Sequence, residues 1–103
     1  MSECIYVVQM DIPAERDADF NRIYETQHVP EILKVPGVLG VERYKLEQSS
    51  EKDMPTYLAI YRCASPDIPQ NAAWKKASDT GDWKEMIRPY TTNRRHTIFS
   101  KLS

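Results

Sequence analysis

The sequence predicts an α+β fold with a four-stranded antiparallel sheet and two helices, in the order strand, helix, strand, strand, helix, strand. Three observations lead to this order. A run rich in β-branched and aromatic residues lies near the N-terminus, and strand-like runs return at three later places. Two segments between these runs carry apolar residues at helical spacing. Proline and glycine stand where one segment gives way to the next.

The first strand is predicted over residues 5–12, and Pro13 ends it. It is apolar on both faces near its start, so we expect both faces to be covered. A helix follows, because side chains recur at the i, i+3, i+4, i+7, i+8 spacing of one helix stripe. These side chains are Phe20, Ile23, Tyr24, Gln27 and His28. Since Pro30 cannot continue the hydrogen-bond ladder, the helix is expected to end or restart at Val29.

Pro30 also suits the first position of a new helical turn, which predicts one short turn over residues 31–34. Pro36 and Gly37 then stop it and lead into the second strand. The second strand, an exposed polar loop and the third strand are predicted at residues 38–47, 48–53 and 56–63.

Ser65 and Pro66 suit the cap and the first position of a second helix, which Gly81 ends. Its predicted buried side is Ala73, Trp74 and Ala77. Asp82 and Glu85 have the spacing of a capping box, which predicts a short helical piece there. The fourth strand is predicted over residues 91–102.

This element order is the split β-α-β arrangement of ferredoxin-like folds, in which both helices cover one face of the sheet. The first and third strands are then antiparallel neighbours. Cys4 begins the first strand and Cys63 ends the third, so the two thiols are expected close together at one end of the sheet.

The other face of the predicted sheet is too apolar to meet water alone. Alternation cannot place all the large strand side chains under two helices, which leaves an uncovered apolar face. The side chains concerned are Tyr6, Val8, Met10, Tyr57, Tyr61, Ile5, Val7, Leu58 and Ile60. A second copy of the chain is the simplest partner, so we expect a homodimer through this sheet face.

Composition sets wide limits on function. The 103 residues are predicted to form one domain, residues 1–103. The formal net charge is −1 with acidic and basic residues well mixed, which argues against nucleic acid or an anionic membrane as partner. No apolar run approaches the ~20 residues of a membrane span, and the N-terminal stretch does not match a signal peptide. A cytoplasmic location is therefore the expectation.

Motifs for nucleotides and metals are missing from the sequence. The chain has 3 glycines, and none of the common phosphate-binding, nucleophile-elbow or zinc-protease motifs occurs. Cys4 and Cys63 do not have metal-ligand spacing, so buried reduced thiols are the simplest interpretation. A metal held by His28 and His96 lacks further ligands. The sequence thus predicts neither a metal nor a bound cofactor.

The run from Tyr24 through His28, Val29 and Pro30, followed by Pro36-Gly37-Val38 and Arg43-Tyr44, resembles proteins of the dimeric α/β-barrel superfamily. It is most similar to the group named after ethyl tert-butyl ether degradation, the EthD-like proteins. This resemblance implies a ferredoxin-like monomer whose sheet packs on that of a second subunit. It also implies a pocket between helices and sheet in each subunit. Relatives include cofactor-free oxygenases, isomerases, cyclases or dehydratases, and haem-binding enzymes.

His28 and Tyr24 are the candidate catalytic residues. His28 lies on the apolar stripe of the first helix, where its pKa is suited to a general acid or base near neutrality. Tyr24 is one helical turn earlier and is therefore able to touch it. The alternative is structural, with a buried imidazole bonded to backbone and a core tyrosine.

Other side chains are candidates for substrate binding. Arg43 and Tyr44 point to opposite faces of one strand, so only one of them faces the pocket. Arg43 would bind a carboxylate or phenolate, and its alternative is a solvated or interface arginine. The remaining candidates are Trp74, Trp83, Tyr90 and His96. The aromatic members would line a pocket for a flat apolar ligand, although Trp74 is explained equally well by core packing.

These features favour a small enzyme without a bound cofactor, of isomerase, cyclase/dehydratase or oxygenase type. Its ligand would be an apolar or aromatic metabolite. The alternatives are a non-catalytic homodimer that binds a ligand or a haem through His28, and a barrel whose pocket is filled by its own side chains.

Overall fold

The computed structural model describes residues 3–102 and shows the predicted α+β architecture. The strands are β1 (Cys4–Asp11), β2 (Val38–Lys45), β3 (Tyr57–Cys63) and β4 (Thr92–Ser100). The α-helices are α1 (Asp17–Ile23), α2 (Val29–Leu33) and α3 (Ala72–Ser78). Two π-helical turns are η2 (Tyr24–His28) and η4 (Trp83–Ile87). Three short 3-10 helices are η1 (Ala14–Arg16), η3 (Ile68–Gln70) and η5 (Arg88–Tyr90).

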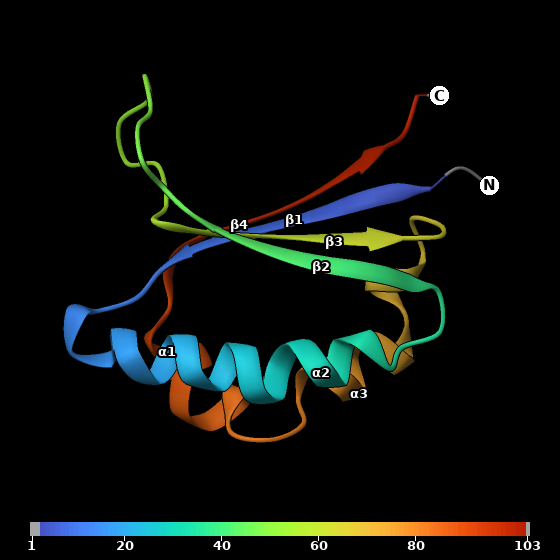
Figure 1. Cartoon of the computed structure of the whole chain (residues 1–103), viewed down its shortest axis with the longest axis horizontal. Coiled ribbons are helices and arrows are strands. Elements are labelled where there is room, and N and C mark those ends of the chain that lie inside the picture. The colour runs from blue at the N-terminus through green and yellow to red at the C-terminus, as the bar shows by residue number, and fades with distance from the viewer. Residues whose placement is uncertain (1–2, 103) are drawn as a thin grey trace.

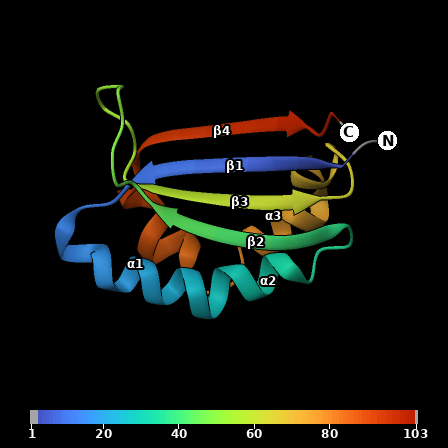
Figure 2. The same cartoon turned by 45° about the horizontal axis from the view of Figure 1, so that its top comes forward.

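The four strands form one antiparallel sheet in the order β2-β3-β1-β4, which confirms the ferredoxin-like prediction. Within residues 3–102, all helices lie on one side of the sheet and no helix covers the other side (Figure 1). The strand order is visible when the molecule is tilted (Figure 2). The predicted strand bounds differ from the observed ones by one or two residues at some ends.

The register between β1 and β3 confirms the expected position of the two cysteines. Cys4 lies opposite Cys63 in this strand pair, and both thiols are free and buried. Their burial raises the pKa of the Cys63 thiol to about 11, so it is protonated at neutral pH. Both residues belong to the main core and behave as small apolar side chains.

Alternation along β1 and β3 divides the large apolar side chains between the two faces of the sheet. Buried residues of the helix-covered side include Met10, Tyr57 and Tyr61. Leu58 and Ile60 lie between the buried positions of β3 and therefore point to the open side. On the neighbouring strands Phe99 is 53% exposed. The structure thus shows the uncovered apolar face that the sequence predicts.

A new α-helical segment begins at Val29, which confirms the predicted restart at this residue. Helix α1, the π-helical turn η2 and α2 follow one another without a break, and the backbone N–H of Val29 donates to the Tyr24 carbonyl five residues back. Pro30 has no N–H to donate, and the wider turn just before it takes up this defect without a break. The consequence is that Tyr24 and His28 remain on one buried face.

The second helical segment begins later than predicted. Asn71, rather than Ser65, caps α3 by accepting a hydrogen bond from the Trp74 backbone N–H at 2.9 Å. Ser65 bonds to the Asp67 side chain instead. The predicted capping box also does not form, because no side chain caps η4.

Asp82, the first residue of that expected capping box, links two distant segments. Its carboxylate accepts from the Gln27 amide at 2.9 Å, and its backbone N–H donates to the Gln27 carbonyl oxygen at 2.8 Å. Gly81 beside it has φ 78° and lies so close to Gln27 that a Cβ would come within 2.6 Å of the Gln27 Oε1 atom. These contacts hold η4 against η2.

None of the helices in residues 3–102 is long and apolar enough to cross a membrane.

Candidate functional site

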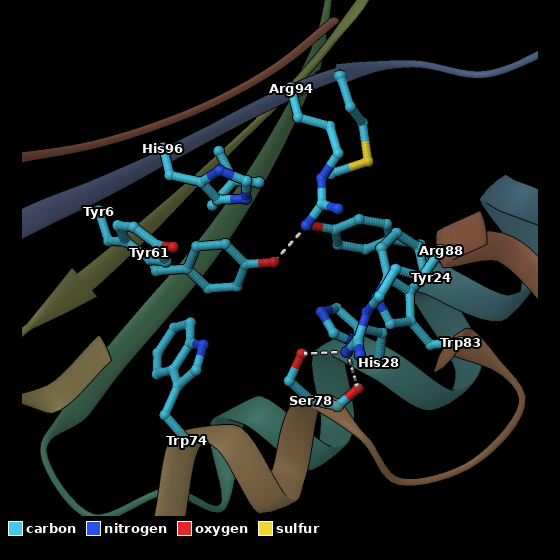
Figure 3. Close-up of a pocket in the computed structure, with 12 residues that line it drawn as sticks. Tyr6, Tyr24, His28, Tyr61, Trp74, Ser78, Trp83, Arg88, Arg94 and His96 are labelled. Atoms are coloured by element: carbon cyan, nitrogen blue, oxygen red, sulfur yellow. Dashed lines mark hydrogen bonds between the residues drawn. The ribbon is translucent and has the colours of Figure 1, made fainter. Parts of the chain in front are cut away.

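A cavity of about 230 Å³ lies between the helix-covered side of the sheet and the helical layer (Figure 3). Strands β1, β3 and β4 form one wall, and η2, α3 and η4 with Arg88 form the other. The lining residues are Tyr6, Val8, Met10, Tyr24, His28, Tyr61, Trp74, Ser78, Trp83, Arg88, Arg94 and His96. The cavity combines aromatic walls with several polar groups that converge on it, as ligand pockets do.

His28 closes the helical wall of this cavity. The residue is 5% exposed, and its Nδ1 atom is buried without a hydrogen-bond partner among residues 3–102. The imidazole stacks on the Trp83 ring at 4.5 Å between ring centroids, and the edge of Tyr24 packs on it at 5.0 Å. Burial, together with the charges of Arg88 and Arg43, lowers the pKa of His28 from 6.5 to about 4. The imidazole is therefore neutral at pH 7.

Tyr24 and Tyr61 meet across the cavity through a hydrogen bond between their hydroxyl groups (Figure 3). Both side chains are almost fully buried, at 2% and 1% exposure. Burial raises the pKa of Tyr24 to about 12 and also raises that of Tyr61. Both groups therefore stay protonated. One hydroxyl donates to the other, and the proton of the second is free to donate to an oxygen atom in the cavity.

Arg43 acts from behind Tyr24. Its guanidinium carbon lies 4.2 Å above the Tyr24 ring, and its nitrogens donate to Glu25 at 2.8 Å and to Asn21 at 2.9 Å. The stacking and the two polar contacts fix Arg43, and with it the orientation of the Tyr24 ring. This position places Arg43 outside the cavity lining.

Two tryptophans form the aromatic walls. Trp74 of α3 packs edge-on against Tyr61 at 5.0 Å and against Tyr6 at 5.5 Å. Trp83 is 4% exposed and stacks on His28, so it is a fixed part of the wall. Because the chain contains only these 2 tryptophans, indole signals report directly on the cavity.

Two arginines bring positive charge to the cavity in different ways. Arg88 forms an ion pair with Asp79 at 2.8 Å and donates to Ser78 at 3.1 Å. Arg94 extends from β4 into the cavity beside His96, as Figure 3 shows. No hydrogen bond or ion pair joins Arg94 to another side chain within residues 3–102.

The structure brings most of the predicted site residues together in this cavity. Those lining it are Tyr24, His28, Trp74, Trp83 and His96. Three predicted residues lie elsewhere in the described chain: Arg43, Tyr44 and Tyr90. Tyr44 points to the open face of the sheet and is 51% exposed, as expected if Arg43 takes the helix side. Tyr90 is 40% exposed and has the Arg16 guanidinium 3.3 Å above its ring.

Sequence reasoning did not select some residues that the cavity contains. Tyr61 was expected only as a strand residue, yet its hydroxyl is the partner of Tyr24. Its position two residues before Cys63 on the buried side of a strand was the available signal. Arg88 and Ser78 carry no comparable signal, because both lie near helix ends whose positions a sequence pattern does not define.

The donor atoms of the site do not match a metal centre, since residues 3–102 contain no group of three His, Cys, Asp or Glu side chains able to hold one. A haem also does not fit as the cavity stands. The neutral imidazole of His28 has the form needed for an axial ligand of haem iron. The cavity volume of about 230 Å³, however, is below the ~300–1,000 Å³ of pockets for drug-sized ligands. Haem is larger than such ligands.

Solved structures of similar fold come from several proteins. An ethyl tert-butyl ether degradation (EthD) family protein from Bacillus halodurans C-125 has a TM-score of 0.66 at 12% identity, over 96% of this chain and 99% of that one. The haem-degrader MhuD from Mycobacterium tuberculosis, with two haems in its active site, has a TM-score of 0.68 at 15% identity, covering 97% and 96%.

A third similar structure is SnoaB, a cofactor-independent oxygenase from Streptomyces nogalater. It has a TM-score of 0.58 at 17% identity, over 100% of this chain and 96% of that one. At such identities the likeness shows the fold alone, and it confirms the expected resemblance to EthD-like α/β-barrel proteins at that level.

Sequence comparison adds a family assignment. No curated protein sequence matches the chain. The model of one family, described as a domain of unknown function (DUF4286), matches residues 3–81, which is more than half of the chain and includes every element from β1 to α3. The chain therefore belongs to the DUF4286 family.

Proposed function

We propose that this protein is a small-molecule enzyme that works without a bound cofactor and transfers a proton on an apolar or aromatic metabolite. The observation that carries this proposal is the cavity in which a buried, neutral and unpartnered His28 faces the hydroxyl pair of Tyr24 and Tyr61. A base next to hydrogen-bond donors in a pocket with aromatic walls is an arrangement suited to enolisation.

His28 is the base in this proposal. Because its pKa is lowered to about 4, the imidazole is unprotonated at pH 7 and free to accept a proton. It would take the proton from a carbon or hydroxyl next to an electron-withdrawing carbonyl, and the electron pair of the broken bond would move to the ligand oxygen. Its stacking on Trp83 fixes the ring in one plane for this step.

Tyr24 and Tyr61 would stabilise the charge that develops on that oxygen. Both hydroxyls remain protonated because burial raises their pKa values. Isomerases, cyclases or dehydratases, and cofactor-free oxygenases all use such a proton transfer, and dioxygen would be the co-reactant of the last class. The arrangement of the cavity supports the shared step rather than one of these outcomes.

The working form in this proposal is a homodimer through the open sheet face. This face carries exposed or half-buried apolar side chains, namely Leu58 and Ile60 on β3 and the 53% exposed Phe99 on β4, beside polar residues such as Gln9 and Arg95. The loop between β2 and β3 rises beyond the sheet on the same side (Figure 1), where it would flank a second subunit. A cytoplasmic setting belongs to the proposal as well, since the opposed thiols of Cys4 and Cys63 are free.

Hydrogen–deuterium exchange tests the proton transfer without knowledge of the natural substrate. 1-Indanone is a small aromatic ketone with exchangeable C–H bonds next to its carbonyl, and proton NMR in D₂O follows their loss. We expect the protein to accelerate the exchange, and His28→Gln to lower the acceleration by roughly 10²–10⁴-fold. Arg95→Gln is the control, because Arg95 lies on the other face of β4 and contacts the exposed loop at Asp53.

The result that contradicts the proposal is exchange at the buffer rate, or equal acceleration by the wild type and a folded His28→Gln variant. Circular dichroism and thermal unfolding establish that the variant is folded. Tyr61→Phe provides a second arm, because it removes one hydroxyl donor while it keeps the ring. Loss of acceleration in both variants, with Arg95→Gln unaffected, would support the assigned roles.

Haem binding is the second candidate function. The neutral imidazole at the cavity wall and the haems bound in the active site of MhuD favour it. The cavity volume of about 230 Å³ opposes it, so binding would require the pocket to widen. Titration with hemin distinguishes haem binding from cofactor-free proton transfer. A Soret band that depends on His28 would favour haem binding, and the absence of a Soret band would exclude it.

A further inference from the structure

The charge inside the cavity is of one sign. Its ionisable lining comprises two arginines, two histidines and tyrosines, and no Asp or Glu side chain lines it. Arg88 is paired with Asp79 outside the lining at 2.8 Å, so its charge is largely balanced. Arg94 has no acidic partner within residues 3–102. Arg94 is exposed, so water hydrates its charge in the free protein, and its guanidinium remains available to an anion at this cavity.

The neighbours of Arg94 respond to this charge. Partial desolvation of His96, an exposed residue, lowers its pKa, and the Arg94 charge lowers it further. For Tyr6, burial raises the pKa and the Arg94 charge opposes that rise. Both residues line the cavity, so the positive potential acts within it. His96 and Arg94 lie on the same side of β4, and Figure 3 shows both reaching into the cavity from the strand side.

A second observation points to a ligand that brings polar atoms with it. His28 is 5% exposed, and its buried Nδ1 atom has no hydrogen-bond partner in the described part of the chain. Buried polar atoms normally find a hydrogen-bond partner, and exceptions concentrate at functional sites. The other lining residues are mainly aromatic, with two tryptophans and three tyrosines beside Val8 and Met10.

We propose that the cavity takes a small aromatic carboxylate, with the ring between Trp74 and Trp83 and the carboxylate on Arg94. This inference rests on the proposed function and specifies its ligand class. The planar guanidinium fork matches the two oxygens of a carboxylate, whereas a neutral ligand forms no ion pair with Arg94. The small volume of about 230 Å³ suits a single ring with short substituents.

The carboxylate also has a role in catalysis. Arg88 and Arg43 disfavour a proton on His28, and a negative charge brought into the same cavity opposes their effect. The ligand itself thus makes His28 a stronger base than it is in the empty cavity. An aromatic acid is for this reason a better substrate class than a neutral aromatic compound of equal size.

Benzoate and benzamide form a matched pair of probes, because they have the same shape and differ in charge. The indole N–H signals of the 2 tryptophans report binding in NMR titrations, since both rings line the cavity. We expect benzoate to bind about tenfold more tightly than benzamide at low salt. Arg94→Gln should abolish this preference, and Arg95→Gln should retain it because that side chain faces the other side of β4.

The possible outcomes separate this inference from the proposed function. Equal affinity of the wild type for benzoate and benzamide would refute the proposed carboxylate preference. It would still support a cavity that binds an aromatic ring. A preference that survives in Arg94→Gln would also overturn it, since the anion would then be held elsewhere. No shift of either indole signal with either probe would overturn the inference and remove the ligand cavity on which the proposed function depends.

Discussion

The buried, neutral state of His28 makes the stability of the protein depend on pH in a defined range. In the unfolded chain the imidazole takes up a proton near its ordinary pKa of 6.5, whereas in the folded protein its pKa is about 4. Between these two values the unfolded state binds more protons than the folded state. The free energy of unfolding must therefore fall as the pH falls from 6.5 towards 4, and this contribution is constant above that range.

The size of the effect follows from the two pKa values. Each unit of difference corresponds to roughly 1.4 kcal/mol, so the interval from 6.5 to about 4 amounts to about 3 kcal/mol. Because the side chain is 5% exposed, little solvent screening reduces this figure. For a small domain this is a large share of a total stability of ~5–15 kcal/mol.

Two measurements check this prediction. Urea unfolding of the wild type and of His28→Gln at a series of pH values should show that the difference between them shrinks by about 3 kcal/mol from pH 7 to pH 4. NMR gives the second readout, since the chain has 2 histidines and His96→Gln leaves only the His28 ring signal. A His28 signal that titrates near 6.5 would refute the argument, and so would a stability difference independent of pH.

Three further predictions test other parts of the structure. Tyr61→Phe leaves the buried Tyr24 hydroxyl without its partner and should lower the free energy of unfolding in urea by ~1–3 kcal/mol. An unchanged unfolding midpoint would show that this hydrogen bond does not stabilise the fold. Asn71→Ala removes the acceptor for the Trp74 N–H and should cost about 1 kcal/mol, whereas Asn71→Asp should cost much less. Ile60→Asp places a charge on the open sheet face and should convert the proposed dimer into a folded monomer in analytical ultracentrifugation; a wild-type monomer would contradict the proposed assembly.

The fold was predictable because its signals are local and repeated. Strand residues alternate between buried and exposed positions along β3, and this period of two is visible in the sequence. The position of Cys4 opposite Cys63 in the sheet followed from the element order alone, because β1 and β3 must be antiparallel neighbours in that topology. The helix caps were less predictable, because Ser65 and Asn71 are equally good cap residues and packing decides between them.

The candidate site was predictable only where one element carries it. Tyr24 and His28 share a helix stripe, so their contact could be expected from spacing, and the structure places their rings 5.0 Å apart. The π-helical turn that holds them could not be foreseen, because it depends on how the chain absorbs Pro30. The positions of Arg88 and of the Tyr61 hydroxyl depend on packing between elements, which a sequence pattern does not contain.

The lowered pKa of His28 and the proposed carboxylate ligand are linked by thermodynamics. If a bound carboxylate raises the pKa of His28 above its value of about 4 in the empty cavity, protonation must in turn strengthen carboxylate binding. Benzoate should therefore bind more tightly at pH 5 than at pH 7, by about twofold if binding raises the pKa of His28 by one unit and by about tenfold if it raises it by two. Benzamide should show no such trend, and His28→Gln should remove it for benzoate. A benzoate affinity that is independent of pH would mean that the ligand charge does not reach the imidazole, and His28 would then remain a weak base with the cavity filled.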